Sequence, residues 1–166
     1  MSMLLSTGMS GLDEVLGNLR LGDNVVWQVD NIDDFVLFVE PFVENSLKQG
    51  RRIVYVRFAK HKPLIKDLSR VKVYDLDSSN SFESFSTQVF DIITREGVEV
   101  FYVFDCLSDL LGDWATDLMI GNFFMITCPF LFELNTIAYF ALLRNNHSYR
   151  TIARIRETTQ LLLDLY

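Results

Sequence analysis

The chain has 166 residues and a mass of 19.2 kDa, the size of one domain or of one part of a longer protein. Hydrophobic residues make up 49% and aromatic residues 13% of it, enough apolar material for a core, which excludes an intrinsically disordered chain. The formal net charge is −7, and an acidic protein lacks the basic footprint that supplies most of the affinity for nucleic acids.

Local signals predict alternating helices and strands along the chain. Helices are expected over 10–17, over 35–42 with helix-start residues at 30–34, over 82–95 and over 148–156. Strands are expected over 25–29, 53–58, 71–76, 98–104, 136–143 and 160–165. The apolar segment 109–134 is expected to be helical or irregular. Ser10 is the expected N-cap of the first helix, and Gly17 suits the left-handed position after it.

This order of elements predicts an α/β fold. Strands that alternate with helices through short turns indicate a mainly parallel sheet covered by helices. The strand 98–104 (VEVFYVF) is nearly all apolar, as expected of a central strand covered on both faces. No Pro-, Gly- or Ser-rich linker divides the chain, so residues 1–166 are expected to form one domain, or the N-terminal part of a longer protein.

The opening segment carries a recognisable motif. Residues 7–17 (TGMSGLDEVLG) resemble the TGxxGLDExLGG opening of the RecA-like ATPases of the KaiC/RadA branch. Residues 103–108 (VFDCLS) resemble the Walker B strand of that family, and 136–144 with 152–165 resemble its last strand, short helix and closing strand. The resemblance implies a three-layer RecA-like fold with a mostly parallel sheet, as in P-loop NTPases.

The phosphate-binding loop of that family is absent. The family places GxxxxGK[ST] after its first core strand, where backbone N–H groups, the lysine and the hydroxyl hold phosphates and Mg²⁺. By the same alignment, its defining positions hold Val29, Asp34, Phe35 and Val36. Asp30, Asp33 and Asp34 would also repel a triphosphate, by about 1 kcal/mol for each carboxylate 4 Å from a phosphate oxygen in high dielectric.

The acidic pair with which the family activates water is also missing. Ala59 and Lys60 stand where that pair would lie after the second strand, and Asp105 alone remains, as the Walker B carboxylate. The resemblance therefore implies a degenerate member with no catalytic residue, no ATP hydrolysis by the P-loop mechanism, no expected ATP binding and no cofactor.

Other groups of polar residues have simpler interpretations. Asp105 with the acids at 30, 33 and 34 has the oxygen ligands of a Mg²⁺ or Ca²⁺ site, but carboxylates at a helix start are typical, so no metal is predicted. Ser108, His147 and a nearby aspartate have the composition of a hydrolase triad. No GxSxG elbow surrounds Ser108, so no triad is predicted.

The charge is unevenly distributed. Residues 48–72 contain nine Lys or Arg and one acid, a net +8, whereas the remainder contains six bases and twenty-one acids, a net −15. We predict a docking face for an acidic partner, or for the acidic part of a second copy. Its residues are Lys60, Lys62, Lys66, Arg70 and Lys72. A solvated helix face and, less favoured, a nucleic-acid surface are the alternatives.

Cysteine usage and apolar runs bear on the compartment. Cys106 and Cys128 lie far apart in apolar stretches, which predicts buried free thiols, and the two histidines with them provide no zinc-type spacing. Residues 1–5 lack the features of a signal peptide. The longest apolar run, 123–132, is shorter than the roughly 18 residues of a membrane span. A cytoplasmic protein without a membrane anchor is predicted.

Together these observations predict a non-catalytic KaiC/RecA-like domain that works by protein association, as a regulatory or assembly module. One alternative is a divergent nucleotide-binding or phosphotransfer enzyme that uses Asp105 and the acidic loop with a metal. Another is a nucleic-acid-associated protein that uses 60–72. Aromatic residues in excess of what the sheet can cover would mark an interface with another domain or subunit.

Overall fold

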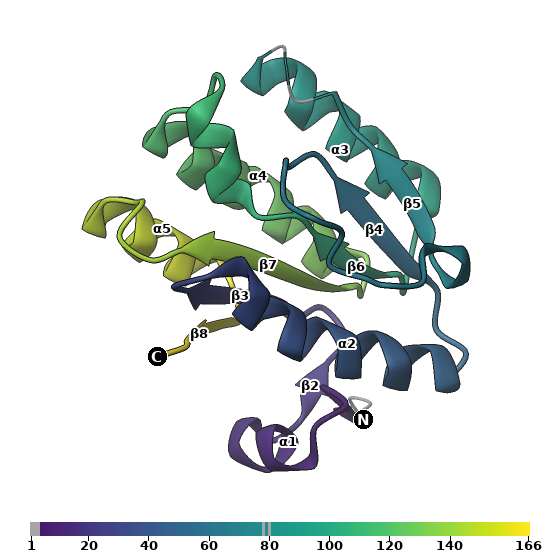
Figure 1. Ribbon diagram of the computed structural model, residues 1–166. Helices are drawn as coiled ribbons and strands as arrows, with labels where there is room; N and C mark the ends of the chain where they lie inside the picture. The colour runs from purple at the N-terminus through teal and green to yellow at the C-terminus, as the bar shows by residue number, and fades with distance from the viewer. Residues whose placement is uncertain (1–3, 78, 80) are drawn as a thin grey trace.

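A computed structural model describes residues 4–77, 79 and 81–166; residues 1–3 of the N-terminal segment considered above lie outside this range. Its main sheet has six strands in the order β5-β4-β6-β7-β3-β8, and every neighbouring pair is parallel (Figure 1). The strands are β3 (Asn24–Val29), β4 (Ile53–Arg57), β5 (Lys72–Asp75), β6 (Phe101–Phe104), β7 (Ile137–Leu143) and β8 (Leu161–Asp164). The predicted α/β class is confirmed.

Helices cover both faces of this sheet, which gives three layers consistent with a RecA-like fold (Figure 1). α2 (Ile32–Lys48) packs on one face, and α3 (Phe82–Glu96), α4 (Asp117–Glu133) and α5 (Tyr149–Thr158) pack on the other. Two 3₁₀ turns, η1 (Leu68–Arg70) and η2 (Leu107–Gly112), lie in the connections. Because side chains alternate along a strand, Tyr102 faces α3 and α4 whereas Val103 faces α2.

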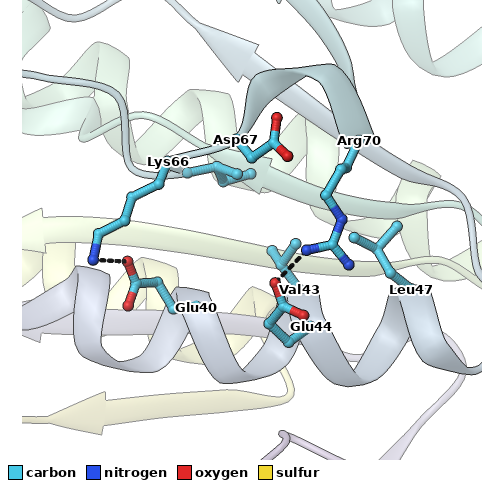
Figure 2. Close-up of a pocket in the computed structure, with 8 residues that line it drawn as sticks. Glu40, Val43, Glu44, Leu47, Lys66, Asp67 and Arg70 are labelled. Atoms are coloured by element: carbon cyan, nitrogen blue, oxygen red, sulfur yellow. Dashed lines mark hydrogen bonds and ion pairs between the residues drawn. The ribbon is translucent and has the colours of Figure 1, made fainter.

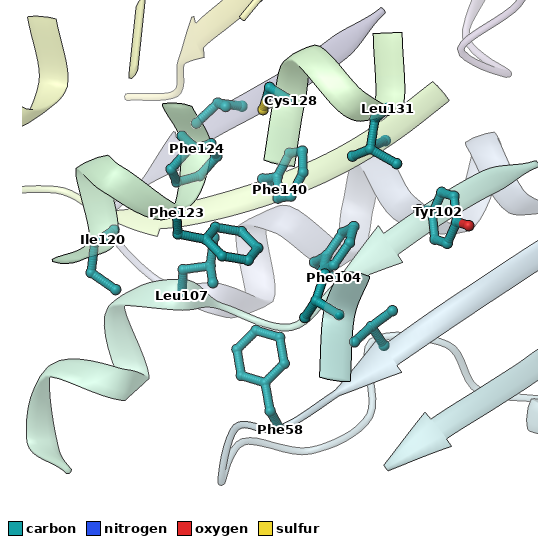
Figure 3. Close-up of a cluster of buried hydrophobic side chains, with 14 of the residues drawn as sticks. Phe58, Tyr102, Phe104, Leu107, Ile120, Phe123, Phe124, Cys128, Leu131 and Phe140 are labelled. Carbon is teal, nitrogen blue, oxygen red and sulfur yellow. The ribbon is translucent and has the colours of Figure 1, made fainter. Parts of the chain in front are cut away.

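The core beneath α3, α4 and α5 is rich in aromatic rings (Figure 3). Phe104 stacks on Phe140 with 4.6 Å between ring centroids, and Phe123 and Phe124 of α4 contact the same ring edge-on. Such pairs contribute roughly 0.5–1.5 kcal/mol each beyond the area they bury. The aromatic residues of β6, β7 and α4 thus fix how these elements pack.

The N-terminal segment forms a small unit below α2. β1 (Leu4–Leu5) pairs antiparallel with β2 (Leu19–Arg20), and α1 (Ser10–Leu16) lies between them. Asp13 accepts hydrogen bonds from the Thr7 N–H and hydroxyl, both at 2.7 Å. Gly8 has a φ of +84°, and a Cβ there would lie 2.1 Å from the Pro41 carbonyl oxygen, so only glycine lets this turn contact α2.

The start of β6 and the cap of α1 differ from the prediction. β6 begins at Phe101 rather than at residue 98, because Gly97 and Glu99 have φ angles of +80° and +58° and turn the chain before the strand. Ser10 is the first residue of α1 and not its cap; Met9 holds that position. Gly17 does adopt the left-handed conformation, with φ +71°.

Both cysteines are buried free thiols, as predicted. Burial raises the pKa of Cys106 to about 11, so this thiol stays protonated at neutral pH. Within the described residues, no helix is long and apolar enough to cross a bilayer.

Candidate functional site

An α/β fold of this kind binds ligands at the carboxyl edge of its parallel sheet. The binding positions are switch points, at which two neighbouring strands lead to helices or loops on opposite faces of the sheet. The chain leaves β3 toward α2, whereas the neighbouring β7 leads to α5 on the other face. β4 and β6 form a second switch point, because β4 leads to the α2 face and β6 leads to α4. Asp30 follows β3 at the first of these places, and Asp105 follows β6 at the second.

At the first switch point, β3 passes into α2 through two residues, Asp30 and Asn31. A phosphate-binding loop needs four residues between its glycines to surround a phosphate group, so this connection is too short to form one. Asn31 is the N-cap, and its side chain accepts a hydrogen bond from the Asp33 N–H at 2.9 Å. Asp33 and Asp34 lie in the first helical turn, where carboxylates complement the helix dipole.

The remaining phosphate-loop positions are part of the core. Val29 is the last residue of β3 and is fully buried, as is Phe35 in the first turns of α2. Val36 is partly buried against the same cluster. These side chains therefore stabilise the contact between β3 and α2 and do not face a ligand.

Arg144, which follows β7, lies across the ends of β3, β7 and β8. Its backbone N–H donates to the Val29 carbonyl at 2.8 Å. Its guanidinium donates to Asp30 at 2.8 Å and to the Asp164 carboxylate and the Leu165 carbonyl, and the Tyr166 ring stacks on it at 4.5 Å. The cation at this switch point is thus supplied by the protein and is paired within it.

Asp105 occupies the second switch point, directly after β6, and is fully buried. One carboxylate oxygen accepts the Phe58 N–H at 3.0 Å and the Ala59 N–H at 3.2 Å. The other accepts the Tyr55 hydroxyl, which in turn accepts the Leu64 N–H at 2.9 Å. Asp105, which the sequence predicts to be a residual Walker B carboxylate, therefore holds the loop after β4 in place.

The His61 ring completes this cluster. The Cys106 N–H lies 3.1 Å from its Nε2, and its Nδ1 lies 2.8 Å from the Lys62 carbonyl oxygen. The Arg57 Nε lies 3.8 Å from Asp105. Burial raises the pKa of Asp105, although the hydrogen bond from Tyr55, the charge of His61 and the Phe58 and Ala59 N–H groups oppose the shift.

The positions of the family's acidic pair have a different use here. Ala59 contributes its backbone N–H to Asp105, and the Lys60 ammonium lies 3.6 Å from Asp113 with its side chain almost fully exposed. No group of three or more His, Cys, Asp or Glu side chains suited to a metal ion is found in the described part of the chain.

Four of the five bases predicted as a docking face lie in ion pairs within the chain. Lys66 and Arg70 pair with Glu40 and Glu44 of α2 at 3.3 and 2.5 Å, across a hollow of about 230 Å³ floored by apolar side chains (Figure 2). The other two pairs are Lys60–Asp113 at 3.6 Å and Lys72–Glu96 at 2.9 Å. Exposed pairs contribute at most about 1 kcal/mol and exchange readily, but the Glu96 side chain in the Lys72 pair is only 6% exposed. Docking through this segment stays a prediction.

Ser108, His147 and Asp117 are brought together, which the sequence-based interpretation did not expect. The Ser108 hydroxyl lies 2.7 Å from His147 Nε2, and His147 Nδ1 lies 2.9 Å from the Asp117 carboxylate. Asp117 begins α4 and also accepts the Ser148 N–H at 3.1 Å and the Thr151 hydroxyl at 2.7 Å. The three side chains have the order and spacing of a hydrolase triad.

The surroundings of this group favour a structural role. The Ser108 oxygen already accepts the Leu143 N–H at 2.9 Å. Ser108 is 4% exposed and the His147 side chain 1%, and the three cavities described in the molecule are lined by other residues. A substrate carbonyl would have to reach a buried oxygen that none of these three cavities adjoins. The group instead connects η2, the end of β7 and the start of α4 and α5.

We expect the stability of the protein to depend on pH through His147. Burial lowers the pKa of this imidazole below its usual 6.5, although Asp117 opposes the shift. The unfolded chain therefore takes up a proton near pH 6.5 that the folded protein does not, and the free energy of unfolding falls as the pH drops below about 7. Urea unfolding from pH 8 to 5 measures this slope.

The control for this pH dependence is His147→Gln, which removes the titrating group. The difference in slope between the two proteins isolates His147 from His61 and from the carboxylates. An identical slope in both proteins would contradict the assignment.

Comparisons with known proteins do not identify the chain: no protein-family model matches it, and no curated protein sequence matches it.

Proposed function

We propose that this chain is a RecA-like domain of the KaiC/RadA type that has lost nucleotide chemistry and acts by association with protein, as a regulatory or assembly module. The observation that carries the proposal is that the protein's own side chains occupy both switch points. Arg144 is paired at one, and Asp105 is saturated with hydrogen bonds at the other.

A nucleotide would have to displace these contacts. A triphosphate at the end of β3 would compete with Asp30 and Asp164 for Arg144, and would meet Asp33 and Asp34 without a lysine or a hydroxyl to balance them. A metal ion at Asp105 would have to replace two backbone donors and a tyrosine hydroxyl, each of which would then be buried without a partner.

The experiment is a thermal-shift titration with Mg-ATP and Mg-GTP to millimolar concentration. We expect no saturable rise in melting temperature. A ligand present at 100 times its dissociation constant stabilises by about 2.7 kcal/mol, which corresponds to a rise of roughly 5–10 °C for a chain of this size.

A saturable rise would contradict the proposal and support the divergent nucleotide-binding alternative. In that case Asp105→Asn, compared with Asp91→Asn on the outer side of α3, would show whether the binding depends on the Walker B position.

A further inference from the structure

α4 is the most apolar helix in the part of the chain that the structure describes. Of its 17 residues, only the first and last, Asp117 and Glu133, carry charge. A helix that is apolar on every side is normally buried on every side. The inner side of α4 is buried against the aromatic core, with Phe123, Phe124 and Leu131 almost completely covered (Figure 3).

The outer side of α4 is exposed in the single chain. Leu118, Met125 and Ile126 are 56%, 44% and 59% exposed. They lie at helical spacing along one stripe, with Asn122 between them. Phe90 of α3 extends the stripe; it is 51% exposed and stacks on Phe130 of α4 at 4.8 Å. Contiguous apolar patches of this kind mark interaction sites.

α3 and α5, on either side of α4, carry opposite charges near their N-terminal ends, at the same level along α4. Arg154 of α5 donates to Asn122 of α4 at 3.3 Å, and the exposed Arg150 lies one helical turn before it. Glu83 lies at the start of α3. The starts of the three helices are level, because Phe82 contacts Trp114 before α4 and the Ser148 N–H binds Asp117. Among the described residues, neither Glu83 nor Arg150 has an ion-pair partner.

We propose that a second copy of this chain covers the outer face of α4, around a twofold axis that runs along α4. Such an axis pairs the apolar stripe with itself and turns α3 of one copy toward α5 of the other. Glu83 then faces Arg150 of the second copy, twice in the dimer. A second copy would cover the stripe with the same apolar stripe of its own α4, and it would place Arg150 opposite Glu83 and Glu83 opposite Arg150.

The charges distinguish this dimer from one whose twofold axis runs across α4 instead of along it. An axis across α4 would place α5 against α5, so that Arg150 and Arg154 would meet their own counterparts. The axis along α4 replaces this repulsion with attraction. The proposal deepens the proposed association function, because it names the surface and the partner.

The first measurement is the mass of the full chain by sedimentation equilibrium across micromolar to submillimolar concentrations. The expected result is a reversible change from 19.2 kDa to twice that value. Ile126→Glu buries a carboxylate in each half of the interface and is expected to raise the dissociation constant by at least about 100-fold. Leu37→Glu, an exposed apolar position on α2, is the matched control and leaves the mass unchanged.

The second measurement tests the axis by charge reversal. Glu83→Arg and Arg150→Glu are each expected to raise the dissociation constant about tenfold, and the double variant restores it, because Arg at 83 then faces Glu at 150 of the second copy. Circular dichroism shows that each variant is folded.

Three results would overturn the interface: a monomer at every concentration, a dimer that persists in Ile126→Glu, or a double variant weaker than both single ones. None of these bears on nucleotide binding. Conversely, a saturable response to Mg-ATP would overturn the proposed function and leave the mass measurements standing.

Discussion

Asp105→Ala is expected to lower the free energy of unfolding by about 3 kcal/mol, because it leaves two backbone N–H groups and a tyrosine hydroxyl buried without acceptors. The donors belong to Tyr55, Phe58 and Ala59, so the loss also releases the loop after β4. Urea unfolding measures the effect directly. A carboxylate kept for metal-assisted hydrolysis would give a different result, in which activity is lost and stability changes little.

Two further variants serve as controls for Asp105→Ala. Asp91→Ala removes an exposed carboxylate of α3 and is expected to change stability by less than about 0.5 kcal/mol. Asp105→Asn keeps one oxygen for the two N–H groups and is expected to fall between the wild type and Asp105→Ala. A wild-type midpoint in Asp105→Ala would show that the cluster contributes nothing to the fold.

Asp117→Ala is the substitution with the second-largest expected effect, a loss of about 2–3 kcal/mol. The carboxylate accepts from the His147 ring, the Thr151 hydroxyl and the Ser148 N–H, and Thr151 and His147 are buried. Burial alone would raise the pKa of Asp117, but these hydrogen bonds hold that pKa below its usual value. Removing the acceptor leaves the starts of α4 and α5 without their common contact.

The measurement is again urea unfolding, with Glu157→Ala on the exposed side of α5 as the control. Ser108→Ala combined with Asp117→Ala tests whether the group acts as one unit. Since both residues bind His147, their effects are expected to be less than additive. Full additivity would mean that the three side chains do not form a network.

Most of the fold could be predicted from the sequence because the signals for its elements are local. The helical spacing of Phe85 and Val89 and the unbroken apolar run before Asp105 are properties of neighbouring residues. The start of β6 could not be predicted in this way. Val98 and Glu99 suit a strand by composition, but Glu99 takes a left-handed conformation, which residue type alone did not reveal.

The candidate site was predicted only in part. The motifs directed attention to Asp105 and to the connection after β3, whereas Arg144 was missed because its partners Asp30 and Asp164 are far away in the chain. Its position directly after a buried strand was the available signal. The contact of Ser108 with His147 was missed for a similar reason: it depends on β6 and β7 lying side by side.

The residues that match the KaiC/RadA motif best are structural in this chain. Thr7 and Asp13 form a hydrogen-bonded turn, and Gly8 lets that turn contact α2 at Pro41. None of them lies at the switch points. A motif of this kind predicts architecture, and the functional interpretation has to come from the residues at the sheet edge.

The pairing of Arg144 has a consequence for how the protein responds to its surroundings. A domain whose binding loop is completed by a soluble ligand becomes more or less stable as the concentration of that ligand changes. Here the groups that satisfy Arg144 belong to the same chain, so their local concentration is fixed by its connectivity. The position of the Arg144 guanidinium is therefore fixed when the chain folds and requires no second molecule.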